Sequence, residues 1–140
     1  ASNIRGMHFW ADENKLLYCV GRNVYVYNVG TASSTTLTNA FATSTGNVGF
    51  CEFLYDDGSV KVVASDGSAT SGLITIDTAN TVVTASDVDI PAHHPTPVFL
   101  DGYLFIAETN TANIWNSELN SPLSFVADTF IATEMEADKV

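Results

Sequence analysis

Two neighbouring histidines are the residues best suited to metal binding or proton transfer. His93 and His94 lie in the proline-rich segment PAHHPTP, residues 91–97. Side chains of adjacent residues in an extended backbone point to opposite faces, so the two imidazoles are not expected to bind the same ion. We expect a solvent-exposed pair in a loop. A pH-sensitive contact at a subunit boundary is the alternative, because histidine titrates near neutral pH.

Two acidic turns carry oxygen atoms that could bind calcium. They are Asp56-Asp57-Gly58 and Asp66-Gly67-Ser68. Neither has the regularly spaced acids and the distal glutamate of a calcium-binding loop. Turn formation explains both, since aspartate and glycine tolerate the positive φ of a tight turn. The residues therefore predict no metal ion and no cofactor.

Signatures of hydrolytic chemistry are missing from the sequence. There is no Gly-x-Ser-x-Gly nucleophile turn and no Ser-x-Asp-x-Gly-x-x-Trp box of the sialidase type. Glu52, Glu108 and Glu118 could supply carboxylates for glycoside cleavage, but that reaction needs two of them facing one site. Their separation does not follow from the sequence. We expect no catalytic residues and no enzymatic activity.

The balance of charge argues against a nucleic-acid-binding surface. The 140 residues include 16 acidic and five basic side chains, for a net charge of −11, and 46% of them are hydrophobic. The length suits one domain, or a fragment of a larger one, and the apolar fraction is that of a globular chain. Negative charge repels phosphate, and no run of about 18 apolar residues could span a membrane. We expect no direct sequence-specific nucleic-acid binding and no membrane partner.

The cysteines and the start of the chain carry less information. Cys19 and Cys51 each lie in an apolar run, LLYCV and GFCEF. Such runs predict buried reduced thiols, and a disulfide between the two stays open. Because the chain starts without methionine, we expect further sequence upstream.

Short runs with a period of two predict strands nearly throughout the chain. In NVYVYNV, for example, Val24 and Val26 share one face of the strand. Asp57-Gly58 and Asp101-Gly102 are strong hairpin signals between such runs. Only residues 133–138 could form a helix. The predicted strands are 7–10, 15–20, 23–28, 48–55, 59–64, 72–77, 81–85, 98–100, 103–108, 113–116 and 124–131. The sequence predicts an all-β fold.

Three stretches of the chain follow one plan: strand, tight turn, strand, irregular segment, strand. The approximate repeats are 7–45, 46–90 and 95–140, and their middle strands recur at intervals of about 45 and about 42 residues. A period in the forties is typical of β-propeller blades. We predict a β-propeller-like array of about three blades, with a β-sandwich as the alternative. Three blades are too few to close a ring, so we expect part of a larger propeller, whose open end faces favour a partner or further sequence.

Aromatic residues at strand spacing are expected to fill the spaces between blades. Trp10 and Trp115 are the first candidates for the other role of such side chains, as anchors of an interface. The aromatic set is Tyr25, Tyr27, Phe50, Phe53, Tyr55, Tyr103, Phe105 and Trp115.

The segment NIWNSELNSPLSFVADTFIATEMEADKV, residues 113–140, resembles a pattern in propeller-like tail and head-completion proteins of tailed bacteriophages. In that family an aromatic-x-Ser step is followed by a polar turn, a proline, an aromatic residue and an Asp-x-Phe strand. The matching positions are Trp115, Ser117, Pro122, Phe125, Asp128, Phe130, Glu134, Asp138, Lys139 and Val140. The hairpin VFLDGYLFIAET, with Asp101 and Gly102 at its turn, is also similar to that family. The likeness covers residues 95–140 well and the first ninety in general plan.

The resemblance implies a structural virion protein of a tailed phage, either a head-to-tail connector or a tail-hub component. Such a protein stacks on portal, adaptor and tail proteins as a homo-oligomeric ring and helps to retain packaged DNA. Two alternatives stay open: an extracellular glycan- or ligand-binding propeller, and a propeller hydrolase. The candidate structural and interaction residues are Trp10, Asp101, Gly102, Trp115, Ser117, Pro122 and Phe125.

Overall fold

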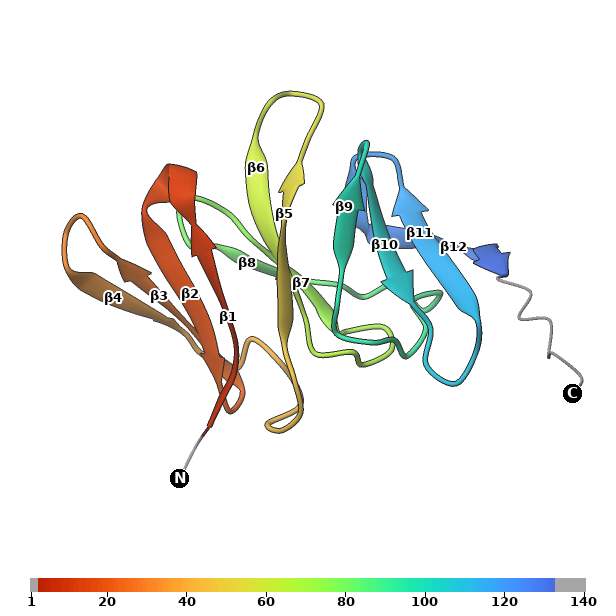
Figure 1. Ribbon diagram of the computed structural model, residues 1–140, viewed down its shortest axis with the longest axis horizontal. Helices are drawn as coiled ribbons and strands as arrows, with labels where there is room; N and C mark the ends of the chain where they lie inside the picture. The colour runs from red at the N-terminus through yellow and green to blue at the C-terminus, as the bar shows by residue number, and fades with distance from the viewer. Residues whose placement is uncertain (1–2, 133–140) are drawn as a thin grey trace, which may run out of the picture.

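The computed structural model describes residues 3–132, which form three consecutive four-stranded antiparallel sheets (Figure 1). The first sheet contains β1 (Ile4–Trp10), β2 (Lys15–Val20), β3 (Asn23–Asn28) and β4 (Ser33–Leu37). The second contains β5 (Gly49–Leu54), β6 (Val60–Ser65), β7 (Leu73–Ile76) and β8 (Val82–Thr84). The third contains β9 (Val98–Leu100), β10 (Tyr103–Ala107), β11 (Asn113–Glu118) and β12 (Ser121–Ala132). In each sheet the strands pair in the order in which they follow along the chain.

The prediction of an all-β fold is confirmed. Within residues 3–132 the one helical element is a short 3-10 turn, Ala11–Glu13, and no helix there is long and apolar enough to cross a membrane. The possible helix at 133–138 falls outside the described residues. There are three sheets, where a single sandwich has two. Each of the three sheets is open, with a free strand at either edge.

The second sheet lies between the other two and packs on both of its faces (Figure 1). Val62 and Ala64 point into a core shared with the first sheet, where they meet Leu17 and Val24. Val63, between them in the sequence, points into a second core with Leu104 of the third sheet. The alternation of side chains along β6 thus divides its apolar residues between two interfaces. This explains why this strand is hydrophobic at consecutive positions.

Glycine lets the first strands of neighbouring sheets approach closely. A Cβ atom at Gly6 in β1 would overlap the carbonyl oxygen of Val48, just before β5. A Cβ atom at Gly49 in β5 would in the same way overlap the carbonyl oxygen of Pro95, just before β9. The two interfaces between sheets therefore repeat one backbone contact, at a position where any side chain would collide.

Basic side chains hold the connections in place. Arg5 donates hydrogen bonds to the carbonyl oxygens of Gly21, Thr43, Thr45 and Gly46 at 2.6–2.9 Å, and so fixes the segment that leads from the first sheet to the second. Arg22 donates to the Phe41 carbonyl, and Lys15 to the Thr78 carbonyl, at 3.0 and 2.6 Å. These cations are engaged by the main chain and not by acidic side chains.

Candidate assembly surfaces

The third sheet leaves an apolar face uncovered on the side away from the second sheet. We call it the last outer face. Val98, Leu100, Ile114 and Ile131 are 56, 62, 37 and 58% exposed, and with Phe105 they line an open groove of about 430 Å³. The cross-strand pairs Val98–Phe105 and Ile114–Ile131 place these side chains on one side of the sheet. An apolar surface shared by four adjacent strands is typical of an interface and not of scattered surface residues.

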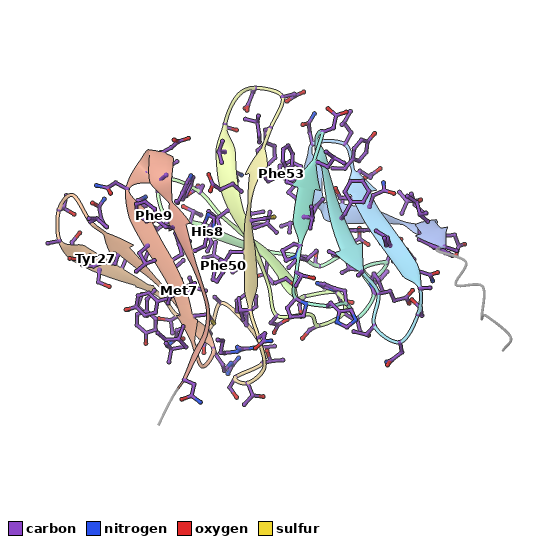
Figure 2. All side chains as sticks on the ribbon, in the orientation of Figure 1. Met7, His8, Phe9, Tyr27, Phe50 and Phe53 are labelled. Atoms are coloured by element: carbon purple, nitrogen blue, oxygen red, sulfur yellow. The ribbon has the colours of Figure 1, made fainter. Side chains whose placement is uncertain are left out.

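The first sheet has a comparable face on its own far side, which we call the first outer face. It consists of Met7, Phe9, Leu16, Tyr18, Tyr25 and Tyr27, which pair across β1, β2 and β3. Met7, Phe9 and Tyr27 are 60, 51 and 36% exposed, and the rings of Tyr18 and Tyr25 stack at 5.2 Å. In Figure 2 Tyr27 lies on the side of the first sheet away from β5, whereas His8 and Phe50 lie between β1 and β5.

Cross-strand pairing shows that the last outer face repeats a face that the other two sheets bury. Trp10 pairs with the first residue of its neighbouring strand, Lys15, and Leu100 pairs with Tyr103 in the same way. In the second sheet the corresponding pair is Phe53 and Lys61, the second residue of β6, because Phe53 follows Gly49 by four residues as Trp10 follows Gly6. Trp10 and Phe53 are fully buried against the next sheet, whereas Leu100 has no next sheet to meet within the described residues.

The first outer face likewise corresponds to the faces of the second and third sheets that contact the preceding sheet. Glu52 on β5 accepts a hydrogen bond from His8 Nε2 of β1 at 2.8 Å. Phe99 on β9 packs its ring 4.9 Å from Phe53 of β5. Phe9 occupies the corresponding position of β1, as the pairs Phe9–Leu16, Glu52–Val62 and Phe99–Leu104 show. Both uncovered faces are thus copies of faces that form interfaces inside this chain.

The two tryptophans lie inside the protein and are not exposed anchors. Trp10 is 1% exposed in the core between the first and second sheets, with Lys15 Nζ 5.8 Å from its ring centre. Its indole nitrogen has no hydrogen-bond partner. Trp115 lies in the core between the second and third sheets, and its Nε1 donates to Glu108 at 3.1 Å. This bond, followed by one from Asn113, lowers the pKa of Glu108.

The other candidate residues of the third sheet build its inner side and its first turn. Asp101 and Gly102 form the two-residue turn between β9 and β10, with φ of 50° and 84°. Ser117 is buried; its hydroxyl accepts from the Leu104 N–H at 2.9 Å and donates to the Glu118 carbonyl. Pro122 and Phe125 are also buried, and the Phe125 N–H donates to Asp87 at 2.9 Å. Glu134, Asp138, Lys139 and Val140 lie outside the described residues.

The expectation of a solvent-exposed histidine pair is wrong for His93. His94 is exposed, but His93 is 2% exposed and lies 2.7 Å, Nε2 to Oγ, from Ser65 at the end of β6. His93 Nδ1 donates to the Pro91 carbonyl at 2.8 Å, so in the neutral ring Nε2 accepts the proton of Ser65. Burial lowers the pKa of His93. Of the two neighbouring imidazoles, one is thus buried and the other exposed.

The acidic turns serve the connections between strands. Asp57 accepts from the Ser59 side chain and backbone, which lowers the pKa of this exposed carboxyl group. Asp66 accepts from Thr43 and from the Ser68 N–H, and so ties the connection before β5 to the one after β6. Among residues 3–132 no group of three or more histidine, cysteine or acidic side chains could hold a metal ion.

The glutamates and the cysteines are engaged at separate places. Glu52 bonds to His8 and Glu118 to Ser124, whereas Glu108 bonds to Trp115. Cys19 and Cys51 are free thiols. Cys19 is buried and Cys51 partly buried, and burial raises the pKa of both, that of Cys51 to about 12.

A polar pocket of about 360 Å³ lies between the turns of the first and second sheets. Its lining includes Trp10 and the polar residues Asp12, Glu13, Ser59, Lys61 and Asp77. Because Trp10 is almost wholly covered, its ring offers no free face on which a sugar could stack.

The aromatic set divides between the cores and the outer faces. Phe50, Phe53, Tyr55 and Trp115 belong to the cores between sheets. Tyr25, Tyr27, Tyr103 and Phe105 do not, so the expectation that most aromatics fill the spaces between sheets holds for half of the set.

Comparison of the chain with known protein families, with curated proteins and with solved structures finds no match.

Proposed function

We propose that this chain is a non-enzymatic structural protein that works by stacking its sheets against those of neighbouring proteins. Its three sheets are then consecutive blades of a β-propeller-like array. The observation that carries this proposal is the repetition of faces. The residues at the position of Leu100 in the other sheets, Trp10 and Phe53, are buried against the next sheet. The residues at the position of Phe9, Glu52 and Phe99, contact the preceding sheet. A sheet that is apolar on both sides is stable when both sides are covered.

The setting we propose is the virion of a tailed phage, at the head-to-tail junction or the tail hub. Support comes from the resemblance of residues 95–140 to propeller-like tail and head-completion proteins. The matching residues Trp115, Ser117 and Phe125 are buried side chains of the third sheet, so the likeness concerns residues on which a fold depends. Portal or adaptor and tail proteins are the partners expected there, with a homo-oligomeric ring as the form of assembly.

The acidic character of the chain suits a channel through which DNA passes. A net charge of −11 does not attract phosphate, and a wall of that sign lets DNA slide past it. We propose that the protein retains DNA by closing a channel and not by binding it. Replacing lumen-facing acidic residues by lysine should then slow DNA ejection, and unchanged ejection rates would contradict this step.

The proposal is tested on particles that contain the chain. Immunogold labelling should place it at the junction of head and tail. Hydroxyl-radical footprinting should show Met7, Phe9, Val98 and Leu100 protected in the particle relative to the isolated chain diluted until it is monomeric, while the exposed loop residue Val88 reacts equally in both. Labelling of these four residues to the same extent in the particle and in the monomeric chain would contradict a stacking function.

A further inference from the structure

We propose that the partner of each outer face is a second copy of this chain: the last outer face of one copy stacks on the first outer face of the other. This inference rests on the proposed stacking function and names its partner. The chain carries both complementary faces, so two copies can cover all four. Six sheets then form one array, within the range of four to eight blades that propellers use.

The interfaces inside the chain predict the contacts between copies. His8 of β1 meets Glu52 of β5, and Cys51 of β5 and Phe99 of β9 pack against the same core between the second and third sheets. Val98 occupies in the third sheet the position of His8 and Cys51, as its pairing with Phe105 shows. Val98 of one copy should therefore meet Phe9 of the other. Where the joint between the first and second sheets has a polar hydrogen bond, from His8 to Glu52, this one is apolar on both sides.

The chemistry of the two faces suits this contact. The residues that define them are apolar or aromatic and carry no charge, in a chain with a net charge of −11. Contact at these faces keeps the acidic groups of both copies out of the interface. Burial of Met7, Phe9, Val98 and Leu100, all more than half exposed, is the driving force for association.

One residue sets the joint between copies apart from the internal joints. Thr96 occupies the position that Gly6 and Gly49 hold in the first two sheets, two residues before Val98 as Gly6 is before His8. At both glycines a Cβ atom would overlap a carbonyl oxygen of the next sheet. Thr96 has that Cβ atom, so its end of the joint stays wider. The joint between copies is therefore looser than the internal ones and reversible.

The mass of the chain in solution is the first test. Light scattering over a concentration series should show a mass rising to twice 15.0 kDa and no further. A mass that keeps rising would mean that the faces join without closing, and would overturn the two-copy array. A mass that stays at 15.0 kDa at every concentration would overturn the second copy as partner.

Two variants test which faces meet. Phe9→Asp disables the first outer face and Val98→Asp the last. Each alone should raise the dissociation constant at least about a hundredfold, because it buries an unpaired carboxylate. Circular dichroism should show that both stay folded, since both side chains are exposed. Val88→Asp, at the most exposed of the large hydrophobic residues, is the matched control and should associate like wild type.

Mixing the two variants distinguishes this arrangement from a symmetric one. In the mixture one joint can form between an intact last face and an intact first face, so a complex of two chains should return. A dimer built from two identical faces predicts otherwise: one variant would stay dimeric alone, and mixing would restore nothing. That result would overturn the proposed pairing.

Thr96→Gly tests the looser joint. It should lower the dissociation constant, whereas Thr96→Ala, which keeps the Cβ atom, should not. Equal affinity of the two variants would overturn the assignment of Thr96 to the position of close approach.

The outcomes of these experiments distinguish the proposed stacking function from the proposal that the partner is a second copy. A chain that stays monomeric but has protected outer faces in particles overturns the second copy alone. Outer faces that react in particles as strongly as in the monomeric chain overturn the stacking function itself.

Discussion

Ser65 Oγ lies 2.7 Å from His93 Nε2, and this buried hydrogen bond ties the end of β6 to the connection that leads from the second sheet to the third. Asp66 and His94 act electrostatically on the same imidazole in opposite directions, but burial dominates and lowers the pKa of His93. The ring is therefore held neutral in the folded protein. Proton uptake there is favoured by unfolding.

Acid should destabilise the protein through this histidine. The unfolded imidazole has a pKa of about 6.5 and the folded one a lower value, so the unfolded state binds more protons as the pH falls below about 6.5. The stabilising contribution of neutral His93 should be fully present above that pH. The free energy of unfolding, measured by urea titration, should therefore decrease from pH 7 to pH 5. His93→Gln should flatten this dependence, whereas His94→Gln, at the exposed neighbour, should retain it. An unchanged slope in His93→Gln would contradict the assignment.

The close approach between sheets makes Gly49 intolerant of a side chain. Gly49→Ala would place its Cβ atom against the Pro95 carbonyl, and we expect a loss of about 1–3 kcal/mol in the free energy of unfolding. Gly30→Ala is the matched control, because its Cβ atom would meet two side chains at 3.4 Å, which can move. Urea unfolding of both variants measures the difference. Equal stability would mean that β5 and β9 separate without cost.

The hydroxyl of Ser117 should contribute to stability through the backbone of β10. Ser117→Ala leaves the buried Leu104 N–H without its acceptor, which costs about 1–3 kcal/mol. Ser34→Ala, at an exposed position of β4, should change the free energy of unfolding by no more than about 0.5 kcal/mol. Thermal unfolding followed by circular dichroism compares the two. A Ser117→Ala variant as stable as Ser34→Ala would show that another group satisfies Leu104.

The thiols should be unreactive until the protein unfolds. Burial raises the pKa of Cys51 to about 12, so almost none of it is thiolate at neutral pH. Alkylation by iodoacetamide, followed by mass spectrometry of the intact chain, should be slow in buffer and fast in guanidinium chloride for Cys51 and Cys19 alike. Rapid alkylation of the folded chain would show that the cores between sheets open readily.

Local pattern determined most of the strands correctly. Lys15–Val20, Asn23–Asn28 and Val98–Leu100 match their predicted ranges, since each alternates polar and apolar residues or adjoins a clear turn. Ser33–Leu37 was not predicted. Its residues Ser-Ser-Thr-Thr-Leu are exposed up to Leu37, so an edge strand with one buried side chain lacks the alternation on which such predictions depend.

Long-range contacts limited what could be predicted of the candidate surfaces. The burial of His93 depends on Ser65, 28 residues away, and nothing in PAHHPTP indicates that partner. The aromatic positions were visible in the sequence, but whether a ring lies in a core or on an outer face depends on which sheet has a neighbour. Tyr25 and Ile74 hold corresponding positions, yet only Ile74 is covered. A signal was available in the repeats, had their strands been aligned position by position.

The use of cations inside the protein has an electrostatic consequence for association. Arg5, Lys15 and Arg22 donate to main-chain carbonyls, and Lys61 lies 5.3 Å from the Tyr55 ring. These neighbours are neutral groups and not the surface carboxylates, and the net charge of −11 makes two approaching copies repel each other before their apolar faces can meet. Added salt screens that repulsion over about 10 Å at 0.1 M. Ionic strength should therefore accelerate encounter, the reverse of what is seen for partners of opposite charge.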